Sequence, residues 1–403
     1  MNILFITHRY PYPPNRGDSI RSFHFLKRMA QMGTVCLATL YDQEPLPEWT
    51  ATLNDLCEEV IAEPWGRRKK WLRAGMSLLR GKTMTEGLFF HPRLKRRIRE
   101  LALRRHFDVV VFFCSSMTPY RSAFRGITPM PRMITDLVDV DSQKWFDYSR
   151  KASGWKKVLF HIEGSRLRKL EKRIADFCES LVVTTPEEAA LYRSFCPVEH
   201  LTPIPNGVDT VFFHSDAIPE MAEIPHRCVF VGAMDYHANV DGVFWFLENV
   251  LPQIRAKYPD CALDVVGSRP VPELKRRCEN TPGAHLVGTV PDVRPYLKRA
   301  AVVVIPLQVA RGIQNKVLEA CSMGRPVVVS PGAAEGIHAD AGTDFLVCDT
   351  PESWVKTLDE VFRNPELRNH LSLAGRRMTE MAYGWPIQLD KLEALLGKDG
   401  NRP

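Results

Sequence analysis

The chain lacks several features that would place it in a specialised class of protein. Its ten cysteines are scattered over 403 residues without a CxxC pair or a zinc-like spacing, and most lie in apolar runs, where a reduced thiol packs like a small hydrophobic group. No stretch of about eighteen apolar residues occurs, so we expect no transmembrane helix. The opening MNILFITHRY has no positive region before its short apolar run and is interpreted as a buried strand rather than a signal peptide. These absences predict a reducing, cytoplasmic setting.

Other absences exclude classes of enzyme and of fold. No GxGxxG follows the first apolar strand of either half, which argues against a dehydrogenase. No acid pair of the DxD type is placed to hold an ion, so we expect neither a metal nor a cofactor. The chain contains no internal repeat and no low-complexity run. Its composition, 45% apolar and 25% charged, is that of an ordinary globular protein.

Short apolar runs separated by helical patterns or loops occur in both halves of the chain. Strands are predicted in the first half at 2–7, 34–40, 107–114, 132–140 and 180–185, and in the second half at 227–234, 262–268, 284–290, 301–307, 326–332 and 344–349. Alternating strands and helices favour parallel sheets. The sequence therefore predicts an α/β protein with two Rossmann-like domains.

Prolines and a glycine mark the join between the halves. Regular structure is interrupted there at Pro203, Pro205, Gly207 and Pro225. We therefore predict a first domain over 1–214 and a second over 215–380. The segment 381–403 is expected to be a helix that crosses back to the first domain.

Positive charge is concentrated in one segment. Between Trp65 and His106 there are fourteen lysines and arginines against two acids, an excess larger than the net charge of +7 of the whole chain. Apolar side chains are interleaved with them, at Trp71, Leu72, Met76, Leu78, Leu79, Leu88, Phe89 and Phe90. Such a mixture suits a helix on an anionic membrane surface. The alternatives are a solvated helix whose apolar residues enter the core, and a nucleic-acid surface, which we favour least.

The stretch RGIQNKVLEACSMGRPVVVS, residues 311–330, predicts a helix that starts just after Gly312. The first turn of a helix attracts phosphate oxygens, and Lys316 adds a full charge. Glu319 lies about 4.5 Å further along the axis, roughly the step from a diphosphate to a ribose, whose hydroxyls would satisfy a buried carboxylate. The alternative is an exposed Lys316–Glu319 pair worth a few tenths of a kcal/mol. The local pattern alone leaves both open.

This stretch resembles the donor-site motif of family 4 glycosyltransferases, which are retaining enzymes with the two-domain GT-B fold. Further similar stretches are YPYPPNRGDSIRSFHFLKRMAQMG (10–33), IPNGVDTVFF (204–213) and AGTDFLVCDTPESW (341–354). More narrowly, MDYHANVDGVFWF and LVDVDSQKW resemble the sugar transferases associated with exosortase (PEP-CTERM) exopolysaccharide systems. The resemblance implies two Rossmann-like domains whose parallel sheets face a central cleft.

The resemblance also implies roles for residues of the second half. Glu319 is expected to hold the ribose of a nucleoside diphosphate sugar, and Lys316 and Arg311 to stabilise the departing diphosphate. Further donor contacts are expected at Gly232, Asn239, Gly312, Glu335 and Gly336. Arg311 stands eight positions before Glu319, where the family usually carries another glutamate.

The first half is expected to bind the acceptor. The candidates are His8, Arg16, Gly17 and Asp18, with Gly17 allowing the loop to approach a ligand closely; a plain turn capped by Asp18 or Ser19 is the alternative. Acids also lie at and beyond the end of a predicted strand, at Asp136, Asp139 and Asp141. Asp139 is the candidate for activating or orienting the acceptor hydroxyl, and surface acids capping a loop are the alternative.

These observations predict a hexosyltransferase that moves a sugar from a nucleoside diphosphate to an acceptor hydroxyl. We expect the acceptor to be a lipid-linked glycan of exopolysaccharide biosynthesis, and the protein to be peripheral at the inner face of the cell membrane. One rival is a non-catalytic nucleotide-sugar-binding or scaffold protein, for which Arg311 is the main support. Another is a sugar-nucleotide epimerase, which would turn over the donor without an acceptor.

Overall fold

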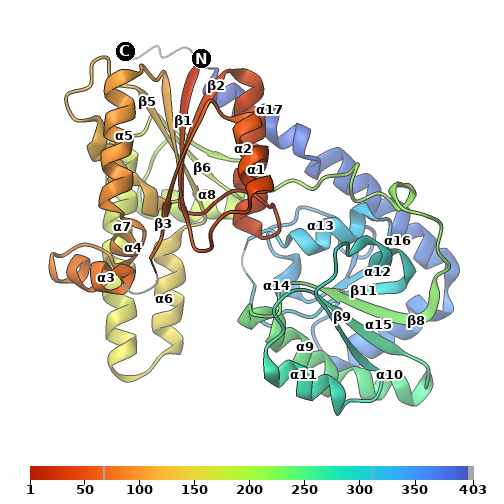
Figure 1. Cartoon of the computed structure of the whole chain (residues 1–403). Helices are drawn as coiled ribbons and strands as arrows, with labels where there is room; N and C mark the ends of the chain where they lie inside the picture. Colours follow the sequence, from red (N-terminus) through yellow and green to blue (C-terminus); the bar gives the residue numbers. More distant parts are fainter. Residues whose placement is uncertain (67–68, 311, 398–403) are drawn as a thin grey trace. The chain divides into compact units, whose positions relative to one another are not determined.

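The computed structural model describes residues 1–66, 69–310 and 312–397. The chain forms two compact units, each built on its own sheet (Figure 1). The first unit comprises Met1–Ile204 and the C-terminal segment from Leu389, and the second comprises Pro205–Gln388. The predicted α/β class with two parallel sheets is confirmed.

The first unit has a seven-stranded parallel sheet in the order β3-β2-β1-β4-β5-β6-β7. Its inner strands are almost entirely buried and apolar, as expected for a parallel sheet covered on both faces. The strands are β1 (Asn2–Thr7), β2 (Thr34–Tyr41), β3 (Glu59–Pro64), β4 (Val109–Phe113), β5 (Arg132–Val138), β6 (Ser180–Val183) and β7 (Leu201–Pro203).

Helices cover both faces of this sheet, with α1 and α2 on one side and α5 and α7 on the other (Figure 1). The amphipathic pattern of α5 explains its place, because Leu94, Ile98 and Leu101 are fully or almost fully buried. The helices are α1 (Gly17–Met32), α2 (Pro47–Leu56), α3 (Lys69–Leu79), α4 (Met84–Phe89), α5 (Pro92–Arg104), η1 (Ser115–Phe124), α6 (Asp141–Lys151), α7 (Gly154–Phe177) and α8 (Pro186–Phe195).

The second unit has a six-stranded parallel sheet in the order β10-β9-β8-β11-β12-β13. The strands are β8 (Ile224–Val231), β9 (Ala262–Val266), β10 (Ala284–Gly288), β11 (Ala300–Ile305), β12 (Val327–Val329) and β13 (Leu346–Val347). In Figure 1, α9, α10 and α11 lie on one side of this sheet and α12 and α13 on the other. The helices are η2 (Ser215–Ala217), α9 (His237–Asn249), α10 (Leu251–Lys257), α11 (Pro272–Glu279), α12 (Arg294–Arg299), α13 (Asn315–Ser322), α14 (Pro331–Ala334), α15 (Pro351–Arg363), α16 (Pro365–Met378) and η3 (Thr379–Tyr383).

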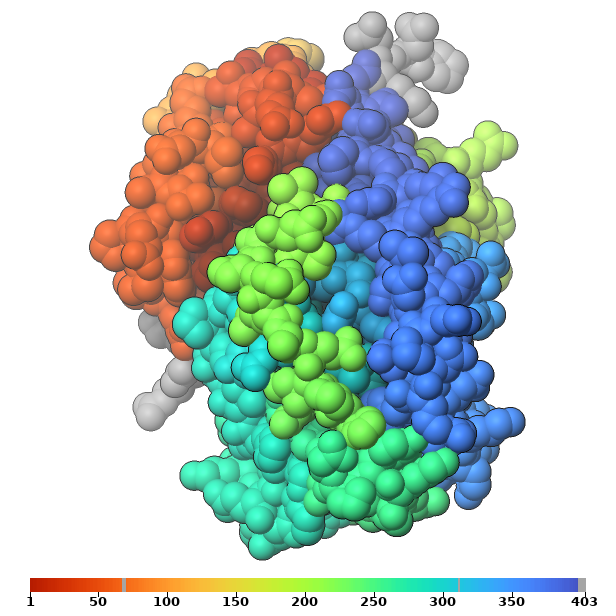
Figure 2. Space-filling model, turned by 90° about the vertical axis from the view of Figure 1, so that its right-hand side faces the viewer, coloured from red at the N-terminus to blue at the C-terminus, as the bar shows by residue number. Residues whose placement is uncertain are grey.

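The first unit ends at Ile204, ten residues before the predicted end at 214. The intervening segment packs on the second unit: Ser322 Oγ donates a hydrogen bond to the Phe213 carbonyl at 2.8 Å, and Arg376 donates to the Thr210 carbonyl at 3.0 Å. Figure 2 shows this segment, in light green, lying across the cyan and blue surface of the second unit. Hydrogen bonds to backbone carbonyls leave no pattern in the sequence. The boundary predicted from the sequence therefore lies later than the one that the structure shows.

The last helix, α17 (Trp385–Leu396), joins the second unit to the first. Its later part belongs to the first unit, where Arg28 of α1 forms ion pairs with Asp390 at 2.5 Å and Glu393 at 2.6 Å. Arg132 donates hydrogen bonds to the carbonyls of Leu395 and Leu396, which satisfies orphan groups at the helix end. The segment assigned to the first unit begins at 389, eight residues after the predicted 381.

Two further observations concern the chemical setting. All ten cysteines are free thiols. Among the helices of the described residues, none combines the length and the apolarity that crossing a membrane would require.

Candidate functional site

The second unit places its candidate residues where the strand order reverses. Strands β8 and β11 are neighbours, but the chain continues from β8 toward β9 and from β11 toward β12. The loops that follow such a pair diverge and leave a crevice at the carboxyl edge of the sheet, which is where open α/β sheets bind ligands. Gly232 lies in the loop after β8 and Asn239 in the first turn of α9, which follows that loop, while the loop after β11 leads to Lys316 and Glu319.

Asn239 connects the segment after β8 to the helix after β11. Its side-chain nitrogen donates a hydrogen bond to the Ala233 carbonyl at 2.9 Å, and its oxygen accepts one from the Lys316 ammonium group at 2.6 Å. A Cβ atom at Gly232 would lie 2.7 Å from the Asn239 amide nitrogen, so the close packing of the turn requires glycine there. Asn239 is 4% exposed. Its buried amide therefore holds the lysine in position.

Lys316 and Glu319 share a low-polarity environment on α13 and are both half-buried. Desolvation lowers the pKa of Lys316 to about 8, against the opposing effect of Glu319. Desolvation likewise raises the pKa of Glu319 to about 7, against the opposing effect of Lys316. Among the described residues, the Glu319 carboxylate accepts no hydrogen bond. An added anion would favour the charged lysine, and added hydroxyl donors would favour the charged glutamate.

The helix that carries this pair begins later than predicted. Gly312 adopts a positive φ of 63°, and α13 starts at Asn315 with Gln314 at its N-cap. The helix was expected to start just after Gly312 and to bind phosphate with its first turn. In the structure the residues from Gly312 to Gln314 still belong to the loop from β11. Arg311, predicted to be catalytic, lies outside the described residues.

Glu335 and Gly336 follow α14, in the loop after the next strand, β12. Gly336 has a φ of 81°, which requires a residue without a Cβ. Glu335 is exposed, and its carboxylate accepts no hydrogen bond from the described residues. Both residues therefore stand near the carboxyl edge of the sheet, but no contact connects them to Lys316 or Glu319.

In the first unit the reversal of strand order falls between β1 and β4. His8 follows β1 and is 8% exposed, with its ring stacked on Phe113 of β4. Its Nε2 lies 3.3 Å from an Asp18 oxygen, while its buried Nδ1 has no hydrogen-bond partner within the described part of the chain. Burial alone would raise the pKa of Asp18, but the hydrogen bond and charge of His8, with Arg9 at 3.4 Å, hold that pKa well below its usual range. The predicted residues His8 and Asp18 are thus in contact.

Arg16 and Gly17 lie at the start of α1 beside this pair. Arg16 occupies the N-cap position of α1. The cap therefore lies two residues before Asp18 and three before Ser19, the two positions at which it was predicted. A Cβ atom at Gly17 would meet nothing within 4 Å, and its φ is not in the positive range. Neither backbone conformation nor packing within the chain requires glycine there, which leaves the approach of a ligand as a reason for it.

The acids after β5 have three different surroundings. Asp136 is buried and forms an ion pair at 2.6 Å with the fully buried Arg21, so its role is structural. Asp139 accepts a hydrogen bond from the Thr184 hydroxyl at 2.9 Å. Asp141 accepts one from Ser115 at 2.9 Å.

Asp141 has a raised pKa, and its position explains why. Desolvation raises the pKa and the charge of Asp139 adds to it, against the opposing effects of Lys144, Ser115 and His8. Ser115 is the second residue after β4 and lies at the strand reversal together with His8. The sequence pattern singled out Asp139, whereas burial and location favour Asp141 for acid–base chemistry.

These acids surround the end of β4. The pKa of Cys114 is raised by burial and then by the charges of Asp141, Asp136, Asp18 and Asp139. Their approach does not create a metal cluster, because no group of three or more His, Cys, Asp or Glu side chains in the described part of the chain is arranged to hold a metal ion.

The basic segment 65–106 separates into two parts with different exposure. On α3 four large apolar side chains face solvent, Trp71, Leu72, Met76 and Leu79, with exposed fractions of 64%, 67%, 42% and 89%. Phe89 and Phe90 instead pack against the core, where Phe89 stacks on Trp65 and Phe90 on Tyr120. The alternative that the apolar residues enter the core therefore holds for α4 but not for α3.

The cationic side chains of this segment also fall into two groups, those paired with acids and those without a carboxylate partner among the described residues. Arginines on and just after α5 form ion pairs with acids of β3 and its approach: Arg93 and Arg97 with Glu63, Arg104 with Glu59, and Arg105 with Glu58. On α3, Lys70 lies 3.7 Å above the Trp65 ring and has no carboxylate partner among the described residues. The uncompensated positive charge is consequently smaller than the sequence count suggests and lies toward α3.

Part of the chain is similar in sequence to a known family of enzymes and to two curated proteins. The model of a family described as glycosyl transferases group 1 matches residues 225–364, which run from β8 through α15 and contain the Asn239, Lys316 and Glu319 site. A protein of Haemophilus influenzae named "Uncharacterized glycosyltransferase" is 27% identical over 254 residues, covering 60% of this chain and 68% of that protein. A 44.6 kDa protein from the cps region of Klebsiella pneumoniae is 21% identical over 378 residues, covering 90% of this chain and 91% of that one.

Solved structures resemble the chain over nearly its whole length. Sucrose-phosphate synthase of Thermosynechococcus elongatus has a TM-score of 0.72 at 16% identity and 98% coverage of both chains. The Anabaena protein HepE in complex with UDP-glucose has a TM-score of 0.69 at 12% identity, covering 99% of this chain and 100% of that one. The solved structures give the chain the GT-B fold, and residues 225–364 are similar to the group 1 glycosyltransferases.

Proposed function

We propose that this protein is a retaining, family 4 hexosyltransferase that moves a sugar from a nucleoside diphosphate sugar to a hydroxyl of a lipid-linked glycan. The observation that carries the proposal is the Asn239–Lys316–Glu319 arrangement at the strand reversal of the second unit. The relative from a cps region favours exopolysaccharide biosynthesis as the setting, together with the resemblance to the exosortase-associated transferases.

In this proposal the donor binds at the second unit. The diphosphate lies beside the Lys316 ammonium group, whose charge stabilises the negative charge that develops as the sugar leaves. Glu319 accepts hydrogen bonds from the ribose hydroxyls, which replace the donors that its carboxylate lacks among the described residues. HepE is structurally similar and is known in complexes with UDP and UDP-glucose, so UDP is the first nucleotide to test.

The acceptor is proposed to bind at the first unit. His8 and Asp18 form a preorganised pair after β1, and Asp141 lies at the same strand reversal with a raised pKa. A carboxylate with a raised pKa takes up a proton from a sugar hydroxyl more readily than an ordinary aspartate does. We assign Asp141 to orient and deprotonate the acceptor hydroxyl, and we keep Asp139 as the alternative predicted from the sequence.

We propose further that α3 docks on an anionic membrane surface, which would bring the protein to a lipid-linked acceptor. Trp71, Leu72, Met76 and Leu79 offer exposed apolar area, while Lys70 on the same helix and Arg80 just after it add charge. An amphipathic helix of this kind lies in the interface rather than spanning the bilayer.

The transferase assignment is tested by incubating the purified protein with a panel of radiolabelled nucleoside diphosphate sugars and membrane lipid extract. We expect label to move into the lipid fraction with release of nucleoside diphosphate. An epimerase would interconvert the sugar of the donor without the extract. A protein that binds UDP in calorimetry but never turns over any donor would support the scaffold rival.

Membrane docking is tested by sedimentation with phosphatidylglycerol vesicles. The double variant Trp71→Ser, Leu72→Ser is expected to bind less tightly, since it removes most of the apolar area that α3 exposes. The matched control is Leu373→Ser on α16, which removes a side chain of similar exposure, 64%, from the second unit. Equal sedimentation of all three proteins would remove the proposed role of α3.

A further inference from the structure

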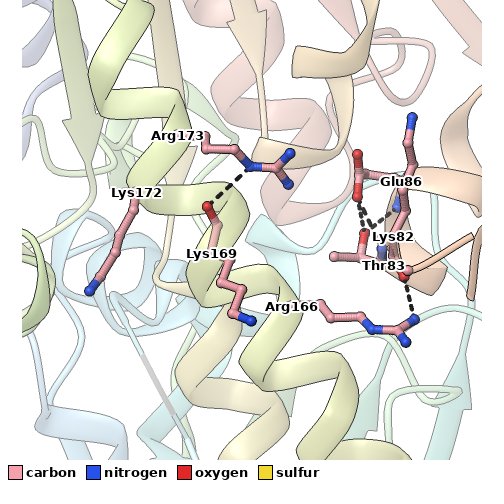
Figure 3. Close-up of a pocket in the computed structure, with 8 residues that line it drawn as sticks. Lys82, Thr83, Glu86, Arg166, Lys169, Lys172 and Arg173 are labelled. Atoms are coloured by element: carbon pink, nitrogen blue, oxygen red, sulfur yellow. Dashed lines mark hydrogen bonds between the residues drawn. The ribbon is translucent and has the colours of Figure 1, made fainter.

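A pocket of about 430 Å³ opens in the first unit between α7 and the turn that joins α3 to α4. Seven side chains line it together with Gly81: Lys82, Thr83, Glu86, Arg166, Lys169, Lys172 and Arg173. Five of the seven are cationic and one is acidic. Figure 3 shows Arg166, Lys169 and Arg173 pointing from α7 toward the segment that carries Lys82, Thr83 and Glu86, whereas Lys172 points away from them.

Hydrogen bonds fix the walls of this pocket. Arg166 donates to the carbonyls of Leu78 and Lys82, at 2.6 and 2.8 Å, which ties α7 to the end of α3. The buried Glu163 accepts hydrogen bonds from the backbone of Met84 and Thr85, which ties the same helix to α4. The pocket is therefore built from two elements that are held together rather than from a mobile surface loop.

The positive charge of the pocket is not neutralised from within. Glu86, its one acid, is engaged as the cap of α4, where it accepts hydrogen bonds from the Thr83 amide and hydroxyl. Within the described part of the chain, Lys82 and Lys169 have neither a hydrogen bond nor an ion pair at their ammonium groups. Cations collected in one pocket without carboxylate partners repel one another, and an anion relieves that repulsion.

The pocket continues an apolar surface on α7. Residues 155, 158, 162, 166, 169 and 173 follow the spacing of one helical stripe. The stripe begins with the exposed Trp155, Val158 and Ile162, at 71%, 59% and 37% exposure, and ends with the pocket cations. An apolar surface next to an anion site matches the boundary between the acyl chains and the head groups of a lipid.

We infer that this pocket binds the phosphate of an anionic membrane phospholipid. Arg166, Lys169, Arg173 and Lys82 supply the charge and the N–H donors, while Trp155, Val158 and Ile162 contact the interface beside the head group. Arginine and lysine are suited to phosphate oxygens, which accept several charge-assisted hydrogen bonds at once. The inference rests on the membrane docking proposed for α3 and adds to it a defined lipid site that involves α7.

The test compares two charge reversals on the same helix in the full-length protein, with phosphatidylglycerol vesicles as the probe. Lys169→Glu places a carboxylate in the lining of the pocket, whereas Lys157→Glu makes the same change of charge on an exposed lysine of α7 that does not line it. Neither ammonium group has a hydrogen bond or an ion pair among the described residues, so both variants are expected to fold. We expect Lys169→Glu to weaken vesicle binding about tenfold and Lys157→Glu to weaken it less than about threefold.

Two further measurements distinguish a specific phosphate site from nonspecific electrostatic attraction to an anionic surface. Vesicles that carry oleic acid, matched in surface potential, should bind the wild-type protein less tightly than phosphatidylglycerol vesicles. Equal loss in both variants, or equal binding to both kinds of vesicle, would show a diffuse charge effect and overturn the inference. Binding of inorganic phosphate without vesicles, lost in Lys169→Glu, would assign the pocket to a soluble ligand and also overturn it.

The result can be separated from the other proposals. Failure of the lipid site leaves wild-type vesicle binding and its dependence on Trp71 and Leu72 intact, whereas failure of membrane docking abolishes sedimentation of every variant. UDP binding, measured by calorimetry, should be the same in Lys169→Glu as in the wild type, because the nucleotide is assigned to the second unit.

Discussion

The Lys316 ammonium nitrogen lies 2.6 Å from the side-chain oxygen of Asn239, 77 residues earlier in the chain. This contact joins the loop after β8 to the helix after β11, the two elements that diverge at the strand reversal of the second unit. A buried amide that is itself anchored on the Ala233 carbonyl leaves the lysine little freedom. The cation is thus preorganised before any ligand arrives, which lowers the entropic cost of binding an anion.

Removal of the Lys316 charge should weaken nucleotide binding. Lys316→Met keeps the length and apolar stem of the side chain but removes the charge-assisted contact with phosphate, so we expect UDP affinity to fall by about 10- to 100-fold. Calorimetry measures this directly. Lys356 of α15 is exposed, and Lys356→Met should change the affinity less than twofold. Comparable affinity of Lys316→Met and wild type would exclude the lysine from the diphosphate site.

UDP affinity should depend on pH through the same pair of residues. Lys316, with a pKa of about 8, is charged below that pH, and Glu319, with a pKa of about 7, is charged above its own. Binding needs both charges, so affinity should be highest between pH 7 and 8 and decline on either side. Lys316→Arg should remove the alkaline decline, since arginine stays protonated. In Glu319→Gln the side chain at position 319 cannot be protonated, so any fall in UDP affinity that remains at acid pH comes from protonation of UDP itself. A flat profile for the wild type would contradict this account.

Asp141 is expected to affect transfer rather than donor binding. Asp141→Asn keeps the shape of the side chain but cannot take up a proton, so kcat should fall about 100-fold while the dissociation constant of UDP stays unchanged. Asp139→Asn should have a smaller effect, since Asp139 is held by Thr184 at a neighbouring strand. The reverse order of the two variants would return the assignment to Asp139.

The buried pair of Arg21 and Asp136 should stabilise the first unit. Asp136→Asn leaves a fully buried guanidinium group without its carboxylate, and we expect the free energy of unfolding to fall by about 3–5 kcal/mol. The comparison is Asp390→Asn, which removes one partner of the exposed Arg28 pair and should cost less than about 1 kcal/mol. Urea denaturation of the full chain measures both. Equal losses would mean that burial does not set the strength of these ion pairs.

The sheets could be predicted because their inner strands are continuous apolar runs. β4 and β11 are buried along their whole length and have no alternative place in a soluble fold. Two edge strands of the first unit were missed for physical reasons. β3 begins with Glu59 and contains Glu63, whose charges are balanced by arginines of α5 that lie far away in the sequence, and β7 has only three residues.

The candidate site could be predicted only in part. The spacing of Lys316 and Glu319 indicated a shared helix, but the contact between Lys316 and Asn239 spans 77 residues and leaves no local pattern. The preference for Asp141 over Asp139 depends on desolvation and on Ser115, neither of which the sequence reveals. Likewise, the apolar residues of α3 and of the segment around α4 look alike in sequence. Only packing against Trp65 and Tyr120 separates the half-buried Phe89 and Phe90 from the exposed Trp71 and Leu72.

The most direct test of the donor site is the ratio of the dissociation constants of 2′-deoxy-UDP and UDP, measured by calorimetry for the wild type and Glu319→Ala. If the carboxylate holds the ribose, the wild type should prefer UDP by at least about tenfold, and the variant should bind both nucleotides with nearly equal affinity. Glu360→Ala, at an exposed position of α15, should keep the wild-type ratio. An unchanged preference in Glu319→Ala would contradict the account.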